Sequence, residues 1–467
     1  MMDVELTLQE AHQAELKHLL HREDGTEAAA YVLYGVNQIG VDPWSRQGRL
    51  RLTSFEIISI PPDDAVSASE RHITWRTDSY VSLCRRAAEE GLLPGIVHSH
   101  PGGFPDFSTQ DDQNERELFR LARNRNGDEA RLLSLLLIGK DRLRARLWVD
   151  EKTPIEIGTI RSVGTRLIYT TVGAATPEAA FDRQARAFGA GLNSILRGLR
   201  VGVVGCGGTG SATAMLLARL GVGQIALFDE DIVEVTNLNR LHGARRADAD
   251  AMRPKVEVVA REISELGLGV RVRAYQRWVE DPSVRDALKA CDVIFGCTDD
   301  HGGRLFLNRF AHFYLVPVID MGLAIEPSPE GGLRDMSARV TVLTPGAPCL
   351  MCRGVVDAQA AGEEALRRNA PAEYERQKRE AYVRGGGNPA PAVVTFTTET
   401  ASIAVNELLQ GLVDYRGEGR WAWQRVRRLD RGEERRQGAK QRSDCPICVD
   451  THYWGRADVE PFLDRIS

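Results

Sequence analysis

The stretch LRVGVVGCGGTGSATAMLLARLG, residues 199–221, decides the fold of the larger part of this 467-residue chain. It opens with an apolar, valine-rich run that predicts a buried strand, and the residues after the glycines follow helical spacing. Between them lies a turn that contains Gly205, Gly207, Gly208 and Gly210. Glycines at such a turn let the backbone approach a phosphate, and the start of a helix favours its negative charge. We therefore expect a strand, a phosphate-binding turn and a helix.

Strands and helices continue to alternate after this turn. Strands are expected at residues 224–230, 270–279, 291–299 and 316–322, with a helix at 303–314. This alternation is typical of βαβ units on a mostly parallel sheet. The sequence therefore predicts an α/β fold, with a Rossmann-like domain over residues 178–467. Residues 353–392 inside it are rich in Ala, Glu and Arg and end in glycine and proline, which indicates a mobile helical insertion.

A second α/β pattern precedes this domain. Strands are expected at residues 31–36, 50–60 and 93–100, and helices at 79–91 and 111–124. Residues 131–150 are typical of a closing hairpin. We expect an N-terminal domain over residues 1–155 and a linker over 156–177, where periodicity is weak. Two domains also suit the chain length, which exceeds what one hydrophobic core usually supports.

Composition and charge exclude several classes of protein. Hydrophobic residues make up 43% and charged residues 27%, with a formal net charge of -5, which argues against a nucleic-acid or membrane partner. Residues 1–20 are acidic and amphipathic at helical spacing, without the features of a signal peptide. The basic run at residues 425–442 is interleaved with acidic residues, so we expect a solvated loop there. The chain is expected to be cytoplasmic.

The stretch HSHPGGFPDFSTQDD, residues 98–112, has the donors of a metal site. His98 and His100 lie on the same face of an extended strand because side chains alternate with a period of two. Asp111 stands at the start of a predicted helix and can supply an oxygen. Two nitrogens and one carboxylate leave a fourth position for water, which is the arrangement of a catalytic zinc site.

The spacing of these residues resembles the JAMM (MPN-plus) metalloprotease family, over roughly residues 25–150. The resemblance implies an α/β zinc metallopeptidase that cleaves isopeptide or peptide bonds after the C-terminal glycine of ubiquitin-like proteins. It implies that His98, His100 and Asp111 bind zinc, that Ser108 hydrogen-bonds the oxyanion and that a glutamate near the first strand is the general base.

Glu27 is the best match for that base, and Glu56 is the competing residue. The alternative function is a JAMM-like domain that only docks the ubiquitin-like partner without cleaving it.

Polar residues that follow the glycine turn indicate which nucleotide it binds. Asp229 ends the next strand, where a carboxylate binds ribose hydroxyls, and so far a nicotinamide-dependent oxidoreductase fits equally well. An arginine, a lysine and a further carboxylate follow, namely Arg240, Lys255 and Asp299. They favour triphosphate chemistry, with Asp299 holding magnesium. The oxidoreductase leaves these residues unexplained.

This set resembles the ThiF/MoeB family of ubiquitin-activating-like adenylyltransferases, over about residues 178–450. The resemblance implies that ATP adenylates the C-terminal glycine carboxylate of a ubiquitin-like protein. It places Gly208 and its neighbours, with Asn237, Arg240 and Lys255, at the phosphates. It places Asp229 at the ribose and Asp299 at magnesium, with Asp300 beside it. Arg183 would reach the ATP of a partner subunit, which implies a homodimer.

Two C-x-x-C pairs, Cys349/Cys352 and Cys445/Cys448, match the structural zinc site of that family. Residues 353–392 contain no cysteine, so we expect no thioester on this chain. Cys206 and Cys297 are expected to pack in the interior.

Together, the two resemblances predict a bifunctional enzyme of a bacterial ubiquitin-like protein system. Its peptidase domain would trim a precursor or release the ubiquitin-like protein from its targets. The adenylated product would pass to a conjugating enzyme or a sulfur-transfer partner. Some systems of this kind act in antiviral (antiphage) defence.

Overall fold

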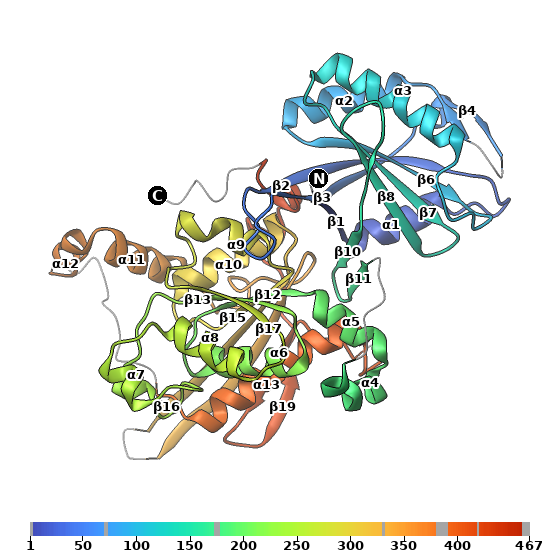
Figure 1. Ribbon diagram of the computed structural model, residues 1–467. Helices are drawn as coiled ribbons and strands as arrows, with labels where there is room; N and C mark the ends of the chain where they lie inside the picture. Colours follow the sequence, from blue (N-terminus) through green and yellow to red (C-terminus); the bar gives the residue numbers. More distant parts are fainter. Residues whose placement is uncertain are drawn as a thin grey trace.

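The computed structural model describes residues 3–69, 73–171, 178–328, 332–379, 391–417 and 420–459, which form two α/β lobes (Figure 1). The N-terminal lobe is built on a nine-stranded sheet of order β11-β10-β1-β3-β2-β6-β7-β8-β9. Its strands are β1 (Asp3–Gln9), β2 (Ala29–Ile39), β3 (Arg49–Ser59), β6 (Leu93–His100), β7 (Leu132–Ile138), β8 (Arg142–Trp148), β9 (Ile155–Glu156), β10 (Thr159–Val163) and β11 (Leu167–Thr171). A separate small hairpin consists of β4 (Ala65–Ala68) and β5 (Ile73–Trp75).

Helices cover both faces of this sheet. Helix α1 (Glu10–Leu20) buries Leu16 and Leu20 in the core of one face. Helices α2 (Asp78–Glu90) and α3 (Thr109–Asn126) bury Leu83 and Phe119 in the core of the other face. The β7–β8 hairpin forms within residues 131–150, as predicted.

Two expectations for this lobe were wrong. Residues 3–9 form β1, not the start of a helix, because their backbone pairs in parallel with both β3 and β10 and their side chains are mostly buried. Within the expected linker, β10 and β11 complete the edge of the sheet, and residues 172–177 lie outside the described residues. Periodicity is weak in β10 because residues 160–163 are buried on both faces.

The C-terminal lobe has an eight-stranded sheet of order β14-β13-β12-β15-β16-β17-β18-β19. Its strands are β12 (Arg200–Val204), β13 (Gln224–Phe228), β14 (Arg271–Tyr275), β15 (Val293–Gly296), β16 (Val318–Pro327), β17 (Leu333–Leu343), β18 (Gln424–Arg428) and β19 (Glu433–Arg436). The first five positions of this order are parallel, which confirms the α/β prediction, and the last three strands are antiparallel. The basic run expected as a loop forms the β18–β19 hairpin, where Arg425 pairs with buried Glu407.

Helices again cover both faces. They are α4 (Asp182–Phe188), α5 (Ala190–Gly198), α6 (Gly208–Leu220), α7 (Arg246–Asp250), α8 (Lys255–Glu265), α9 (Arg285–Lys289), α10 (His301–Phe313), α11 (Ala358–Asn369), α12 (Pro371–Arg379) and α13 (Val394–Val413). Helices α6, α8 and α13 share one core with the sheet, and α9 and α10 share the other. None of the helices in the described ranges is both long and apolar enough to cross a membrane.

The insertion at residues 353–392 is helical, as predicted, in α11 and α12. Helix α11 is docked against the lobe through hydrogen bonds to α10 described below, and the expected mobility of the insertion stays a prediction. Residues 380–390 lie outside the described residues.

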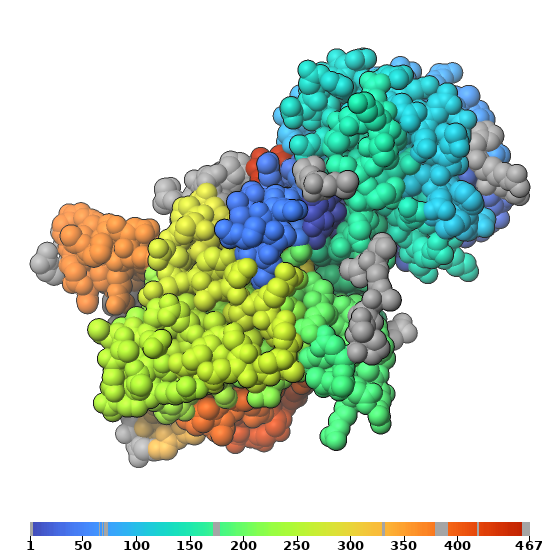
Figure 2. All heavy atoms as spheres, viewed as in Figure 1, coloured from blue at the N-terminus to red at the C-terminus, as the bar shows by residue number. Residues whose placement is uncertain are grey.

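Buried charges join the two lobes. Arg51 on β3 is 1% exposed and bonds Glu5 of its own lobe at 3.2 Å and Asp292 of the other lobe at 2.9 Å. Arg161 pairs with the same two carboxylates at 3.0 and 2.9 Å. Figure 2 shows residues of the N-terminal lobe (blue) in contact with residues of the C-terminal lobe (yellow and green). Buried ion pairs therefore join the two lobes.

The C-terminal strap, residues 449–459, makes a second connection. Ala457 forms a parallel bridge with Val36 on β2, and Thr53 on β3 donates to the carbonyl of Gly455 at 2.6 Å. A Cβ atom on Gly35 would lie 1.9 Å from that carbonyl oxygen, so only glycine fits there. The strap thus ties the end of the second lobe to the sheet of the first.

Candidate functional site

The predicted metal ligands of the N-terminal lobe come together at the end of β6. His98 and His100 are the sixth and last residues of this strand and are 5% and 6% exposed. Asp111, in the first turn of α3, places Oδ1 3.3 Å from His98 Nε2 and Oδ2 3.5 Å from His100 Nε2. The three ligand atoms lie within 4.8 Å of one another, a spacing that one metal ion can bridge.

Hydrogen bonds fix the orientation of these groups. The Nδ1 atom of His100 lies 3.2 Å from the carbonyl oxygen of Phe104, which directs Nε2 toward Asp111. Burial by itself would raise the pKa of Asp111, but hydrogen bonds from His100 and His98 hold that pKa below its usual value. Two imidazoles and an ionised carboxylate suit zinc.

Ser108 and Glu27 flank this cluster. Ser108 caps α3, because its hydroxyl accepts from the Asp111 amide at 3.1 Å and its own amide donates to Asp111 Oδ2 at 2.6 Å. Glu27 is 4% exposed and lies just before β2, whose Ala29 pairs with His98. Its Oε1 atom is 3.8 Å from His100 Nε2. The competing Glu56 instead pairs with Arg86, so the structure brings Glu27 and not Glu56 to the cluster.

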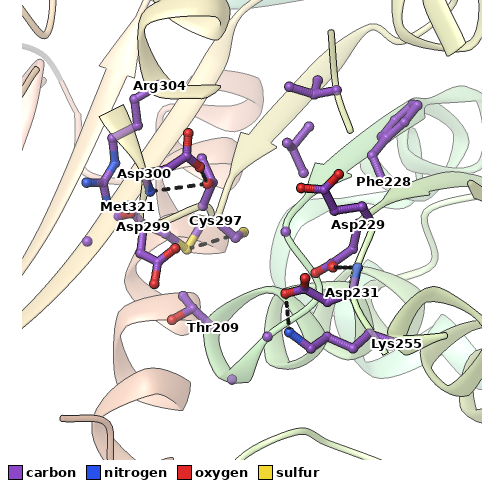
Figure 3. Close-up of a pocket in the computed structure, with 18 of the residues that line it drawn as sticks. Thr209, Phe228, Asp229, Asp231, Lys255, Cys297, Asp299, Asp300, Arg304 and Met321 are labelled. Atoms are coloured by element: carbon purple, nitrogen blue, oxygen red, sulfur yellow. Dashed lines mark hydrogen bonds and ion pairs between the residues drawn. The ribbon is translucent and has the colours of Figure 1, made fainter. Parts of the chain in front are cut away.

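The glycine turn of the second lobe forms one wall of a cavity of about 360 Å³ (Figure 3). Gly205 has a φ of +88°, and a Cβ there would meet the backbone of Cys297 at 2.9 Å. Gly207, Gly208 and Arg240 also line the cavity. A glycine turn that opens a 13-residue helix beside an arginine is an arrangement that binds phosphate.

Asp229 and Lys255 lie at one side of the cavity. Asp229 follows β13 and accepts from the Cys206 amide at 2.6 Å, so it also holds the glycine turn in place. Burial raises the pKa of Asp229, and the nearby charge of Lys255 opposes this shift. Lys255 itself pairs with Asp231 at 2.7 Å.

Asp299 and Asp300 lie on the opposite side, with Arg304 beyond them, and Thr209 lies between the two sides (Figure 3). Asp300 caps α10 by accepting from the Gly303 amide at 2.6 Å. Asp299, which follows β15, lines the cavity and can hold a cation near a bound phosphate. Arg304 is held by buried Asp320 at 3.4 Å.

Two residues predicted for this nucleotide site, Gly210 and Asn237, lie outside the cavity lining, and the reach of Arg183 to a partner subunit's ATP stays a prediction. Gly210 packs in the interior, where a Cβ would stand 1.8 Å from the carbonyl oxygen of Gly205. Asn237 caps a local turn by accepting from the Glu234 amide at 3.0 Å. Arg183 lies on α4. Gly210 and Asn237 therefore act on the shape of the loops around the site.

The four cysteines of the C-x-x-C pairs converge. Their Sγ atoms are 3.5 Å apart between Cys349 and Cys445, 3.5 Å between Cys352 and Cys448, and 3.6 Å between Cys448 and Cys445. A hydrogen bond with Cys448 is the largest cause that lowers the pKa of Cys349 to about 4. Four sulfurs at this spacing can hold one metal ion, and a set of four cysteines suits zinc.

The remaining cysteines are poor nucleophiles. Burial raises the pKa of Cys84 to about 11 and that of Cys297 to about 12. Burial also raises the pKa of Cys206 and Cys291. The cysteines outside the zinc cluster therefore remain protonated thiols near neutral pH.

Residues 181–447, more than half of the chain, match the model of the ThiF family. The chain belongs to the ThiF family. Residues 9–149 match the model described as prokaryotic homologs of the JAB domain. The fusion indicated by the two motifs is thus confirmed at the level of families.

Several curated relatives, which are adenylyltransferases or an activating enzyme by name, are similar to a part of this chain. The SAMP-activating enzyme E1 of Haloferax volcanii is 30% identical over 33% of this chain and 52% of its own length. The molybdopterin-synthase adenylyltransferase of Salmonella typhimurium is 33% identical over 34% of this chain and 59% of its own length. The sulfur carrier protein ThiS adenylyltransferase of Escherichia coli is 32% identical over 25% of this chain and 46% of its own length. The chain thus spans about half the length of these relatives.

Residues that sequence reasoning missed complete the ThiF-domain cavity. Arg304 follows Asp299 by five residues on the next helix, so the pattern D-D-H-G-G-R was a usable signal. Trp278 and Arg368 reach the cavity from a loop after β14 and from α11. No local pattern marked these two, because only the fold brings their segments together.

Proposed function

We propose that the ThiF domain adenylates the C-terminal glycine carboxylate of a ubiquitin-like protein. The observation that carries this proposal is the combination, in one cavity, of a glycine turn, the cations Arg240 and Lys255, and Asp299. A carboxylate oxygen of the partner attacks the α-phosphorus of ATP. The bond from that phosphorus to the oxygen bridging to the β-phosphate breaks, and pyrophosphate leaves with the electron pair.

Each charged group has a role in this step. Arg240 and Lys255 offset charge that develops on the phosphates. Asp299 would hold magnesium, which supplies further neutralisation of the phosphate oxygens when bound. Asp229, hydrogen-bonded to the turn, would orient the ribose.

The activated product leaves as the adenylate. Thioester formation needs an accessible thiolate. Outside the zinc cluster, Cys84, Cys206 and Cys291 are buried and Cys297 is partly buried, and burial raises the pKa of each of these thiols. The acceptor nucleophile therefore belongs to another molecule, such as a conjugating enzyme or a sulfur-transfer partner. Arg183 serves the ATP site of a second subunit in a homodimer.

Exchange of labelled pyrophosphate into ATP, in the presence of the candidate partner, tests the adenylation. Wild-type protein and the control Asp128→Ala, at a side chain 87% exposed in the other lobe, should both exchange. Asp299→Ala should reduce exchange by a hundredfold or more, an order of magnitude typical of lost electrostatic stabilisation. Unchanged exchange in Asp299→Ala would refute the assignment.

A second function, hydrolysis after the same glycine, is favoured by the position of Glu27 beside the ligand cluster. A zinc ion held by His98, His100 and Asp111 would activate water and polarise the scissile carbonyl. Glu27 would accept the proton of the attacking water and transfer it to the leaving amine. Ser108, which caps α3, would hydrogen-bond the oxyanion.

The peptidase test uses a ubiquitin-like protein with a C-terminal extension, whose mass is followed after incubation. Glu27→Gln keeps the shape of the side chain and should abolish cleavage, whereas Glu56→Gln should leave it unchanged. Binding of the extended protein without any cleavage by the wild type would favour the non-cleaving docking domain.

A further inference from the structure

Helix α11 of the insertion forms part of the cavity wall, although it lies outside the βαβ core. Arg368, in its last turn, lines the cavity together with Trp278 and Glu230. The guanidinium carbon is 3.8 Å from the centre of the Trp278 ring, which is stacking distance. Trp278 itself packs tightly against α10, because a Cβ on Gly303 would stand 2.9 Å from its ring.

Polar contacts hold α11 in this position. Glu364, one turn before Arg368, accepts from the Gly302 amide at 2.7 Å at the start of α10. The amide of Asp357, just before α11, donates to His301 Nδ1 at 3.2 Å. Among the residues of α11, only Ala361 is buried. Few apolar contacts therefore fix the helix, and its docking depends on charge and hydrogen bonding.

Arg368 has unused donor capacity. Its ion pair with Glu230 is 3.7 Å long, and its charge opposes the rise that burial causes in the pKa of Glu280 and of Asp300. Among the residues that the structure describes, Arg368 donates no hydrogen bond. Other cations of the cavity are engaged, as in the pairs of Lys255 with Asp231 and of Arg304 with Asp320. A guanidinium carries five N–H donors in a plane that matches phosphate oxygens. ATP with one magnesium ion keeps a net negative charge, which a guanidinium with free N–H donors would partly offset.

We propose that Arg368 is an ATP-contacting residue that binds the phosphate chain from a helix outside the βαβ core. This inference rests on the proposed adenylation site. It assigns a binding role to α11, where Glu364, one turn before Arg368, holds the helix against α10.

The test is calorimetric binding of ATP with magnesium to the full-length protein, together with the KM for ATP in pyrophosphate exchange. Arg368→Ala should weaken binding and raise KM by about ten- to a hundredfold, the effect of losing one charge-assisted hydrogen bond. Arg368→Lys should have a smaller effect, since it keeps charge but loses the planar fork. The KM for the protein partner should not change in either variant.

Arg367→Ala is the matched control, because Arg367 is the exposed neighbour on the same helix turn and does not line the cavity. If Arg368→Ala binds ATP as Arg367→Ala does, while the wild type binds ATP and exchanges, the inference fails and the proposed function stands. A parallel rise in KM for both substrates with a lowered melting temperature would also overturn it, as the sign of a structural role. Wild-type protein that does not bind ATP would instead refute the proposed function itself.

Discussion

Replacing Arg51 with methionine should destabilise the interface between the two lobes. The Arg51 guanidinium donates to Glu5 and Asp292 and, at 2.7 Å, to the carbonyl oxygen of Cys291. It therefore satisfies carboxylates from both lobes and a backbone group of the second. Methionine keeps most of the volume of the side chain, so the main loss is the charge and its hydrogen bonds.

The magnitude follows from burial. Glu5 and Asp292 keep Arg161 as a partner, so neither carboxylate becomes fully unpaired. Burial raises the pKa of Glu5, but Arg161 and Arg51 outweigh it and hold that pKa at about 2, so removing one cation makes the charged form less stable. A buried charge left without a partner typically costs about 3–5 kcal/mol. Because Arg161 keeps both carboxylates paired, we expect a smaller loss here, about 2–3 kcal/mol, as for a lost hydrogen bond to a charged group. That is a large share of a total stability of about 5–15 kcal/mol.

Urea unfolding of the wild type, of Arg51→Met and of a control variant, followed by tryptophan fluorescence and by circular dichroism, measures this loss of stability. Arg120→Met is the control, because the Arg120 side chain is 54% exposed in its ion pair with Glu151. This variant should lose at most about 1 kcal/mol of stability. The wild type should unfold in one transition, and Arg51→Met should lower its midpoint or split it into two. A loss for Arg51→Met no larger than that for Arg120→Met would refute the view that these charges hold the lobes together.

Three further outcomes follow from the same structure. Gly35→Ala forces a Cβ to within 1.9 Å of a strap carbonyl and should cost about 1–3 kcal/mol in thermal unfolding, whereas Gly158→Ala, with open space around it, should cost little. Burial lowers the pKa of His12 to about 4 from 6.5, so the unfolded chain binds a proton first as pH falls. The free energy of unfolding of the wild type should therefore drop by about 2 kcal/mol between pH 8 and pH 5 because of His12. His12→Gln should lack this part of the pH dependence, and equal pH profiles for the wild type and His12→Gln would contradict the reasoning. Cys349→Ser should release bound zinc and increase hydrogen exchange in the strap, and the buried Cys84→Ser should do neither.

Local patterns could be predicted, and pairings between distant segments could not. The strand, glycine turn and helix at residues 199–221 are contiguous, so spacing alone indicated them. In β1, Val4, Leu6 and Leu8 alternate with polar residues, a signal for a strand that the helical spacing of the following residues obscured. Buried Arg51 gave no signal at all, because its partner Asp292 belongs to the other lobe.

The predicted metal cluster shows why spacing alone was informative there. The His98-x-His100 spacing is the period of a strand, and Ser108-x-x-Asp111 is the spacing of a helix cap, in which each residue bonds the amide of the other. The motif is therefore satisfied by two ordinary elements, a strand end and a helix start. The residue that separates a catalytic cluster from a structural one is Glu27, which reaches the cluster through the pairing of β2 with β6. That pairing spans some seventy residues of chain, as the contact of the Ala28 amide with Ser99 Oγ at 3.0 Å illustrates. The sequence therefore left Glu27 and Glu56 as competing candidates for the base, and the fold brings Glu27 to the cluster while Glu56 pairs with Arg86. Exchanging Glu27 for glutamine thus tests the chemistry while leaving both local elements intact.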